Sequence, residues 1–387
     1  MIPDRTHWGL IALTFAIGLF AALQFGKVSL TLVEFSAHYT RPIPVMAGLV
    51  SLVGVIGIVF GVMAGGWIAR FGPRQVIIWA TGLGAALSLV QMALPPLPIL
   101  FALRGLEGIS HLALVVAAPP LMAGFATDRD RPVVMAIWAM FFGVAFAMAA
   151  QIIPWIIGAG GLPLLFGLHG VGLLVCMGLF ARWVPARFGP PSPTAQMGYV
   201  AQHWMIYTHV HLCAPALGFF FYAFLFVATV TFLPMALSLP YLGTTLPLVS
   251  LAGTLWAGRL AQSMNAATIS MTGFASMALC AVGVTIGVEW AVYPLFLAMG
   301  MVPGAQFALI PALNTTTADQ TRATGAIAQM GNMGTVNGTP FFALILQGLG
   351  PLTVTLAIAV IGLCGAAVVW ALQRQTRLSG DVAQPGK

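Results

Sequence analysis

The stretch GGWIARFGPRQ, residues 65–75, interrupts a chain that is apolar for about twenty residues on either side of it. Two arginines, Arg70 and Arg74, and the pair Gly72-Pro73 stand close together there. An apolar run of about 18 residues or more is long enough to cross a bilayer as a helix. The stretch therefore predicts a short basic turn between two membrane-spanning helices.

The composition extends this interpretation to the whole chain. Its 387 residues are 60% hydrophobic and 6% charged, whereas a soluble domain is about one quarter charged. We therefore expect an all-α integral membrane protein in a lipid bilayer. The net charge of +7 reports topology in such a chain, so no nucleic-acid partner is expected. The four cysteines are isolated, and no GxxxxGK[ST] loop occurs, so neither a metal site nor a cofactor is indicated.

Hydropathy predicts twelve transmembrane helices, separated by turn residues such as Pro95-Pro96. Their expected ranges are 8–35, 43–69, 75–94, 98–124, 132–157, 162–183, 208–235, 241–262, 267–287, 290–313, 323–348 and 352–373. The predicted domains are an N-terminal six-helix bundle (1–184), a cytoplasmic linker loop (185–207), a C-terminal six-helix bundle (208–374) and a cytoplasmic tail (375–387).

The basic residues predict the orientation, because cytoplasmic loops of membrane proteins are enriched in Lys and Arg. If both termini are cytoplasmic, the opposite loops keep only Arg41. The cytoplasmic set is then Arg5, Arg70, Arg74, Arg129, Arg131, Arg182, Arg187, Arg259, Arg322, Arg374, Arg377 and Lys387. The first apolar run is too long for a cleaved signal peptide, and we expect a multi-pass protein of the bacterial inner membrane.

The second helix of each predicted bundle carries a related segment. Gly66-Trp-Ile-Ala-Arg70 aligns with Gly258-Arg-Leu-Ala-Gln262. Repetition at this distance predicts two six-helix pseudo-repeats. Such a construction is typical of secondary transporters, whose binding site lies between the repeats near the middle of the membrane.

With these residues in place, the chain resembles the major facilitator superfamily. The loop between the second and third helices of that family has the pattern Gly-x-x-x-Asp-Arg-x-Gly-Arg-Arg. Four residues here match it: Gly65, Arg70, Gly72 and Arg74. Ala69 replaces the Asp and Pro73 the first closing Arg. The resemblance implies that this conformational loop motif lies on the cytoplasmic side and that the two helical halves rock against each other.

Further segments resemble the same family. Arg104-Gly-Leu-Glu107-Gly108 is similar to its Arg-x-x-Gln-Gly segment in the fourth helix. The run 132–138, the segment 152–155 and the residues around Tyr222 and Pro234 are similar to the cyanate and nitroimidazole permease branch. The fifth helix lacks the Gly-Pro signature of drug exporters, which makes export the less favoured direction.

Candidate site residues are the ionisable side chains inside the predicted spans, because each one is costly there unless it has a partner or a wet cavity. Arg104, Glu107 and His111 share one face of the fourth helix. One interpretation is that Arg104 binds an anionic group while Glu107 or His111 carries a coupling proton. The other is an ion pair that only stabilises packing.

Lys27 is expected at a similar height to Arg104, in the half of the first helix farther from the N-terminus. Together the two could form a positively charged outer cavity; alternatively, Lys27 snorkels to the interface. The polar stripe of the eleventh helix contains Gln329 and Asn332, and we favour Asn332 as a binding residue. His169 is interpreted as an interior histidine with a local hydrogen bond.

Small residues recur every fourth position on two of the predicted helices. Gly57, Gly61 and Gly65 do so on the second, and Gly334 and Gly338 on the eleventh. Such spacing allows close approach of helix backbones. The family resemblance implies that these two helices face each other across the halves.

The expected function is secondary transport of a small polar or anionic organic molecule by alternating access, as proton symport. The alternatives are a drug or metabolite efflux pump and a non-transporting receptor of the same fold. An enzyme is not expected, because the few acidic residues are scattered over different loops. The protein is expected to act as a monomer.

Overall fold

The computed structural model describes residues 4–127, 129–186, 188, 197–314 and 317–382. Parts of the predicted linker and tail lie outside the described residues, namely 187, 189–196 and 383–387, and with them Arg187 and Lys387 of the predicted cytoplasmic set. The described residues contain fourteen α-helices, one 3₁₀ turn and no strand. The predicted all-α fold class is therefore confirmed.

The first seven helices are α1 (Trp8–Ser29), α2 (Leu32–Tyr39), α3 (Ile43–Phe71), α4 (Pro73–Gln91), α5 (Leu97–Gly124), α6 (Arg131–Ala139) and α7 (Phe141–Trp183). The remaining helices are α8 (Tyr199–Thr208), α9 (Val210–Leu237), α10 (Leu242–Leu260), α11 (Ala266–Thr285), α12 (Val292–Leu313), α13 (Thr317–Leu349) and α14 (Pro351–Val382), with the 3₁₀ turn Glu289–Ala291 before α12.

Eight of the described helices are long and apolar enough to cross a membrane: α1, α3, α5, α7, α9, α11, α12 and α14. The helices α4, α10 and α13 are also at least 19 residues long but more polar. The 43-residue α7 contains two runs, because Gly160 and Gly161 leave the helical conformation between them. The twelve predicted runs can all be followed in these helices.

Two predicted ranges each cover a break between two helices. The first, 8–35, is divided at Leu30 and Thr31 into α1 and α2. The Thr31 hydroxyl donates to the carbonyl of Lys27 at 2.5 Å, a contact to the preceding turn that bends helices. The fifth, 132–157, is divided at Met140 into α6 and the first run of α7. Hydropathy does not mark either break, because the chain stays apolar through both.

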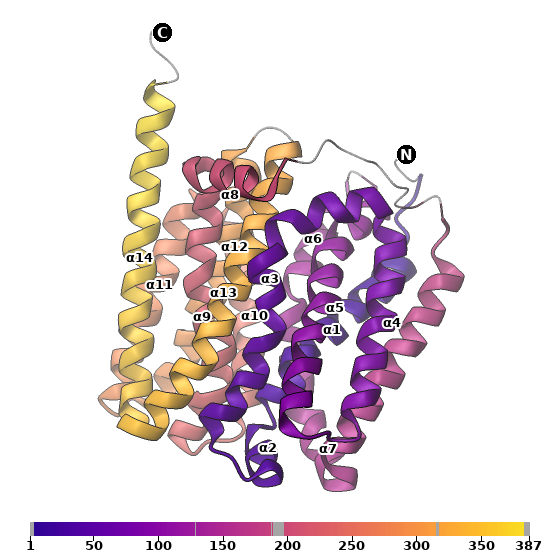
Figure 1. Ribbon diagram of the computed structural model, residues 1–387. Helices are drawn as coiled ribbons and strands as arrows, with labels where there is room; N and C mark the ends of the chain where they lie inside the picture. Colours follow the sequence, from indigo (N-terminus) through magenta and orange to yellow (C-terminus); the bar gives the residue numbers. More distant parts are fainter. Residues whose placement is uncertain (1–3, 128, 187, 189–196, 315–316, 383–387) are drawn as a thin grey trace.

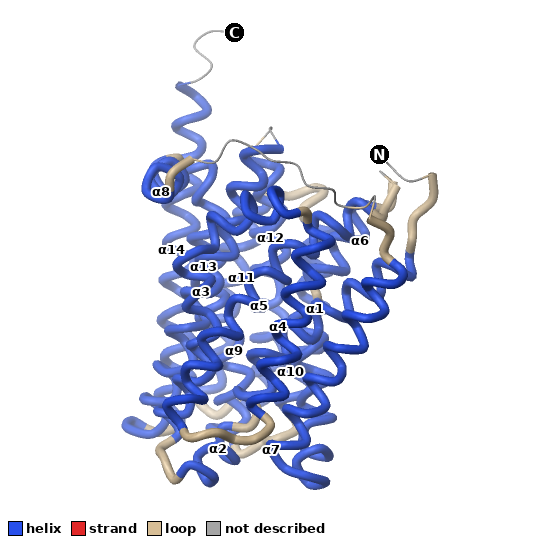
Figure 2. Tube along the Cα trace, turned by 45° about the vertical axis from the view of Figure 1, so that its right-hand side comes forward, coloured by secondary structure: helices blue, strands red, loops and turns tan. Residues whose placement is uncertain are grey.

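The helices run between two faces of the molecule. α1 begins and α14 ends at the upper face of Figure 1, here called the termini face, and α2 lies at the opposite face, here called the α2 face. The loops gather at these two faces (Figure 2). Arg74, Arg182 and Arg259 stand at helix ends on the termini face.

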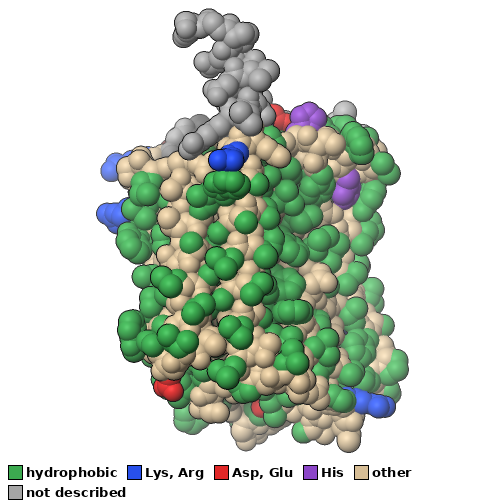
Figure 3. Space-filling model, turned by 90° about the vertical axis from the view of Figure 1, so that its left-hand side faces the viewer, with side chains coloured by type: hydrophobic (Ala, Val, Ile, Leu, Met, Phe, Trp, Pro, Cys, Tyr) green, Lys and Arg blue, Asp and Glu red, His purple; other side chains and the backbone are tan. Residues whose placement is uncertain are grey.

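The helices of the first part of the chain, α1 and α3–α7, lie on the right in Figure 1, and α9–α14 lie on the left. The main contacts between these two sets are α3 with α13 and α7 with α10. The outer surface carries a broad apolar band between rims of charged side chains, which Figure 3 shows on one side. A band of this kind suits a bilayer.

Buried apolar packing closes the molecule toward the α2 face. One continuous core cluster there includes Phe35 of α2, Phe146 of the first set, and Phe226 and Leu246 of the second. The rings of Phe146 and Phe226 are 6.1 Å apart. Toward the termini face the first set has a core cluster of its own, built by α1, α3–α7 and neighbouring residues. The two sets therefore share a large core toward the α2 face. Toward the termini face they share a smaller one, in which Val62 of α3 clusters with Ala323 of α13, and the remaining space there leaves room for a cavity.

Candidate functional site

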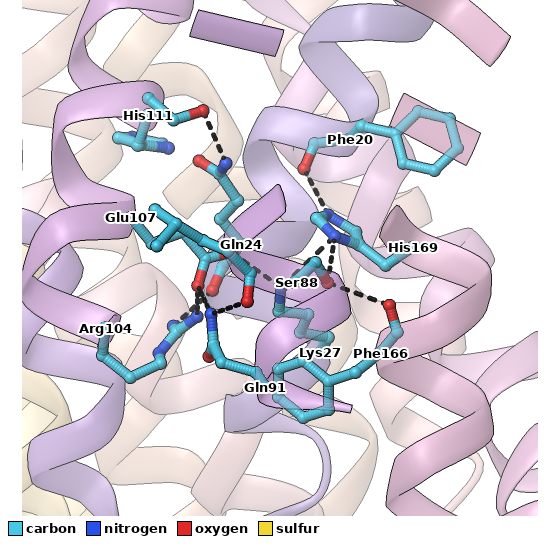
Figure 4. A network of polar contacts seen from close by, with 12 residues as sticks. Phe20, Gln24, Lys27, Ser88, Gln91, Arg104, Glu107, His111, Phe166 and His169 are labelled. Atoms are coloured by element: carbon cyan, nitrogen blue, oxygen red, sulfur yellow. Dashed lines mark hydrogen bonds and ion pairs between the residues drawn. The ribbon is translucent and has the colours of Figure 1, made fainter. Parts of the chain in front are cut away.

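Three of the predicted site residues meet inside the first set of helices (Figure 4). Lys27 stands in the last turn of α1, and Arg104 and Glu107 stand one turn apart on α5. Lys27 Nζ lies 2.6 Å from Glu107 Oε1, and Arg104 Nη1 donates to Glu107 Oε2. All three side chains are at most 1% exposed.

Arg104 is bound entirely within this part of the molecule. Its Nε donates to the carbonyl of Leu49 at 3.0 Å, and its Nη2 donates to the carbonyl of Gln24. Together with the bond to Glu107, each guanidinium nitrogen has an acceptor. The predicted positively charged outer cavity is therefore wrong for this structure, because backbone carbonyls and Glu107 occupy the groups that would form it.

The carboxylate of Glu107 receives donors from three helices. Besides Lys27 and Arg104, the Gln91 Nε2 of α4 donates to Oε2 at 2.9 Å. Bonds from charged donors to a buried carboxylate are strong. The carboxylate thus joins α1, α4 and α5 at one point.

Lys27 also contacts α4 and α7. Its Nζ lies 3.2 Å from Ser88 Oγ and 3.2 Å from His169 Nδ1. Lys27 Nζ also lies over the Phe166 ring, 4.7 Å from the ring centroid. His169 Nε2 lies 3.0 Å from the carbonyl of Phe20, the local bond expected for this histidine.

The charges in this network do not cancel. With ordinary protonation, Lys27 and Arg104 contribute two positive charges and Glu107 one negative charge. Buried charges are tolerated only when they are paired and hydrogen-bonded. One positive charge is left over in the interior, so the network is more than a self-neutralising ion pair.

His111 lies at the edge of the network. Its Nδ1 lies 3.0 Å from the carbonyl of Ala21, and a carbonyl can only accept. Nδ1 therefore carries the hydrogen, and Nε2 of the neutral ring is an acceptor. No described residue hydrogen-bonds to Nε2. The rings of Phe25 and Phe142 stand edge-on against the imidazole, with centroids 4.8 and 6.2 Å away.

His111 also lines a cavity of about 440 Å³ between the two sets of helices. The cavity extends from residues near the termini face, such as Gln320 and Pro311, to Phe25 and Phe226 in the interior. Its aromatic lining consists of Phe25, Trp138, Phe141, Phe142, Phe219, Tyr222, Phe226 and Phe307. Its side-chain polar groups include those of His111, Gln320, Thr324, Asn332 and Thr335. None of the described residues that line it is Lys, Arg, Asp or Glu.

Of the polar stripe on α13, Asn332 lies in the cavity wall, as does Thr335. The Asn332 Nδ2 donates to Ala328 O of its own helix at 2.8 Å. Gln329 also faces α3, where it donates to the carbonyl of Ile58. Asn332 packs against Gly57 of α3 as well. Both amides therefore contact α3, and of the two only Asn332 is among the described residues that line the cavity.

Comparison with known proteins identifies the family. The family model described as Major Facilitator Superfamily matches residues 13–326. The chain belongs to the major facilitator superfamily. The solved structure of the human organic anion transporter MFSD10 (TETRAN) has a similar fold, with a TM-score of 0.67 and 13% identity, over 95% of this chain and 100% of that one. The comparison with curated proteins gives no match.

Membership of the major facilitator superfamily makes the chain a multi-pass membrane transporter of a small molecule rather than an enzyme. The predicted fold and the predicted class of protein are thus confirmed. The resemblance to the cyanate and nitroimidazole branch gains no support from these comparisons.

The four residues of the superfamily loop motif lie where α3 meets α4. Gly72 has φ of +84°, which suits glycine in the turn. Arg74 donates from Nε to Val184 O at 2.8 Å and from Nη2 to Ala181 O at 3.0 Å, at the end of α7. Arg70 lies over the Phe71 ring, and Gly65 has Thr321 of α13 as its nearest neighbour. Arg74 therefore binds α4 to α7 by capping the end of that helix.

The short helix α8 bridges the two sets of helices at the termini face. Its Gln202 Nε2 donates to Val62 O of α3 at 2.7 Å, and its Tyr207 hydroxyl donates to Gln329 Oε1 of α13 at 2.6 Å. Gln329 Nε2 lies 2.9 Å from His203 Nε2. Burial raises the pKa of Tyr207 above its ordinary value, so the hydroxyl remains a donor.

Sequence reasoning did not connect Ser88, Gln91 or His169 with the site. They come from α4 and α7, and only the packing of these helices against α1 and α5 brings them to Lys27 and Glu107. A histidine inside a span is itself a signal of function, and that rule could have grouped His169 with the site. The aromatic lining of the cavity has no such signal, because aromatic residues occur in most of the spans.

Proposed function

We propose that this transporter carries a small organic solute by alternating access and couples it to proton movement, as a symporter. The observation that supports this most is the position of His111: it lines the cavity between the two helix sets and stands one turn from Glu107 on α5. A solute in the cavity would therefore be close to a buried ionisable cluster. The bodies that move would be residues 1–184 and 208–374, joined by the linker 185–207.

The charge of the cluster supports a role in proton coupling over a role in helix packing alone. Lys27, Arg104 and Glu107 carry one uncompensated charge in a fully buried setting, and such a cluster changes its preferred protonation when its surroundings open to water. A change in access during transport would thus move a proton. Glu107 is required for this proton movement because its carboxylate forms ion pairs with both basic groups, Lys27 and Arg104.

The cavity lining supports a polar solute without a net charge. The groups available for recognition are aromatic faces and the uncharged polar atoms of His111, Asn332 and Thr335, and pockets of this composition suit an organic molecule with an apolar body and a few hydrogen-bonding groups. An anionic solute has less support, because Lys27 and Arg104 are bound elsewhere.

The proposed setting is the bacterial inner membrane, with the termini face in the cytoplasm. The arginines at helix ends on that face support this orientation by the positive-inside rule. With this orientation the cavity would open toward the cytoplasm, while the shared core at the α2 face would close the opposite side. We propose a monomer as the functional unit.

Efflux of an aromatic compound is the second candidate. It is favoured by the eight aromatic side chains in the cavity, which offer adaptable contact to apolar molecules. The direction of proton-driven flux separates it from uptake. A receptor that moves nothing would bind a solute and show no flux.

A thermal-shift screen of small organic molecules, followed by flux measurements, tests the proposal. A ligand at a hundred times its Kd adds about 2.7 kcal/mol to stability, so true ligands stand out. Each hit is then assayed in proteoliposomes with an imposed pH gradient, for wild type and Glu107→Gln. We expect the gradient to drive accumulation by wild type only. Unchanged gradient-driven accumulation by a folded Glu107→Gln protein would exclude the role given to the cluster.

A further inference from the structure

Lys27 has a complete set of acceptors around its side-chain nitrogen. Nζ lies 2.6 Å from Glu107 Oε1, 3.2 Å from Ser88 Oγ and 3.2 Å from His169 Nδ1. An ammonium group has three N–H donors. The three acceptors come from α5, α4 and α7 and satisfy the charged form in full.

The hydrogen-bond pattern of His169 makes its Nδ1 an acceptor. Nε2 lies 3.0 Å from the carbonyl of Phe20, and a carbonyl can only accept, so Nε2 carries the ring hydrogen. In the neutral ring Nδ1 is then an acceptor, 3.2 Å from Lys27 Nζ and 3.0 Å from Ser88 Oγ. While the Ser88 hydroxyl donates to Phe166 O, this lone pair is available to Lys27. The imidazole therefore accepts an N–H from Lys27 whether Lys27 is charged or neutral.

Ser88 can serve both forms of Lys27. Its hydroxyl donates to the carbonyl of Phe166 at 2.9 Å and offers its oxygen to the ammonium. A neutral amine has two N–H donors and one lone pair. If Lys27 loses a proton, the Ser88 hydroxyl can turn from Phe166, whose carbonyl lies inside α7, and donate to Nζ. The two remaining N–H groups of Lys27 keep Glu107 and His169 as acceptors.

Glu107 has no comparable second state. Its Oε1 accepts from Lys27, and its Oε2 accepts from Arg104 and Gln91. A protonated carboxyl would direct an O–H at one of these donors and break a bond. It would also leave a net charge of two in the interior, whereas loss of a proton from Lys27 leaves none. Burial of net charge is costly. Loss of a proton from Lys27 is therefore more favourable than gain of a proton by Glu107 as the second protonation state of the cluster.

Among the described residues, the other titratable groups of this cluster are Arg104, Glu107, His111 and His169, and neither histidine is hydrogen-bonded to Glu107. Arg104 stays charged in proteins, and His111 of α5 donates to Ala21 O. Helix α4 contributes Ser88 and Gln91, which do not titrate, and α7 contributes His169. Among the described residues of α2, α3, α6 and α9, no titratable side chain is hydrogen-bonded to Lys27.

We propose that Lys27 is the group that takes up and releases the coupling proton, and that Ser88 and His169 are positioning residues which satisfy both of its forms. This inference rests on the proposed proton-coupled function and names the carrier within it. The step moves one proton between Lys27 Nζ and water that reaches the cluster in another state of the transport cycle. Glu107 remains the fixed negative charge throughout.

The chain offers a direct test, because its only lysines are Lys27 and Lys387. Lysine labelled with ¹³C at Cε in a Lys387→Arg background gives one signal, recorded against pH in lipid nanodiscs without any solute. Glutamate labelled with ¹³C at Cδ gives three signals, for Glu34, Glu107 and Glu289. We expect the Lys27 signal to change from ammonium to amine with rising pH, while the Glu107 signal remains that of a carboxylate.

Variants at the positioning residues give the second readout. A hydrogen bond from the ammonium is stronger than one from the neutral amine. Removing one in Ser88→Ala or His169→Phe is therefore expected to lower the midpoint of the Lys27 transition by about one pH unit, whereas Ser88→Thr, which keeps the hydroxyl, leaves it unchanged. A Lys27 signal that stays that of an ammonium, or a Glu107 signal that titrates in its place, overturns the proposal. Because no solute is needed, absence of flux in vesicles would count against the proposed function alone.

Discussion

The carboxamide of Asn332 on α13 lies directly against the backbone of Gly57 on α3, so that a Cβ atom at position 57 would stand 2.3 Å from Asn332 Cγ. Asn332 is also part of the cavity wall. The contact between the two helix sets and the shape of the cavity therefore depend on the same pair of residues. A change in the packing of α3 on α13 should therefore change the shape of the cavity.

Alanine substitutions along this face of α3 should differ in a defined order. At Gly61 a Cβ meets backbone atoms of Gln329 at 3.0 and 3.1 Å, which cannot move aside, so Gly61→Ala should cost about 1–3 kcal/mol of unfolding free energy. At Gly57 the neighbour is a side chain, so Gly57→Ala should cost less and weaken solute binding by displacing Asn332. Denaturant unfolding in detergent and ligand titration measure the two effects.

The matched control is Gly65→Ala on the same face. The nearest atom to its added Cβ is Thr321 Cγ2, at an ordinary contact distance of 3.6 Å. Alanine is a better helix former than glycine by about 1 kcal/mol, so this variant should be neutral or slightly stabilised. Equal losses at all three positions would show that close packing on α13 is not the cause.

Features that depend on a single helix could be predicted from the sequence. The spans follow from hydropathy, and the shared face of Arg104 and Glu107 follows from their spacing on one helix. It also placed Lys27 and Arg104 at a similar height, and they do meet at Glu107. Gly57 and Gly61 do face α13, whereas Gly334 and Gly338 pack against Phe224 of α9 instead.

The predictions that were wrong or incomplete concern side-chain surroundings that depend on how the helices are rotated against one another. Whether Arg104 faces a cavity or the carbonyls of Leu49 and Gln24 is decided by the packing of α5 against α3 and α1. The same holds for His169 and Ser88, which reach Lys27 from helices distant in sequence. Apolar residues of similar size cover all sides of these helices, so their pattern does not define the buried face.

The break inside α7 should depend on Gly161. This residue has φ of +65° and ψ of −161°, a region that only glycine adopts without strain. We expect Gly161→Ala to lower the unfolding free energy by about 1–3 kcal/mol. Gly158→Ala is the control, because it lies in the same helix with nothing within 4 Å of an added Cβ. A similar stability for both variants would mean that the second run of α7 can start without the break.

Loss of the buried carboxylate should be among the costliest single changes in the protein. Glu107→Ala leaves Lys27 and Arg104 together without a counter-charge, and removing one partner of a buried ion pair costs about 3–5 kcal/mol. Arg322→Ala breaks an ion pair of 2.8 Å with Asp319 whose side chains are 35% and 36% exposed, and should cost at most about 1 kcal/mol. Thermal unfolding in nanodiscs compares the two, and a loss for Glu107→Ala as small as that for Arg322→Ala would contradict the expected charge balance.

Gln329 should help to hold the present arrangement of the two helix sets. Its amide bonds at once to Ile58 O of α3 and to His203 and Tyr207 of α8, so Gln329→Met keeps the volume and removes all three bonds. A loss of about 1.4 kcal/mol for this state changes the ratio of two states about tenfold. In a cysteine-free background, a Thr324→Cys probe in the cavity wall should then react more slowly with a maleimide added at the termini face.

Asn337→Met on the same helix is the control for this shift. Asn337 is exposed and, within the described part of the chain, its side chain donates to Met333 O of its own turn alone, so its replacement leaves the contact between α3, α8 and α13 intact. We expect the labelling rate at position 324 to match wild type in this variant. If Gln329→Met and Asn337→Met labelled at the same rate, the bridge made by α8 would contribute nothing to the balance between the two states, and the closure of the termini face would have to be controlled from the cavity or from the Lys27 cluster.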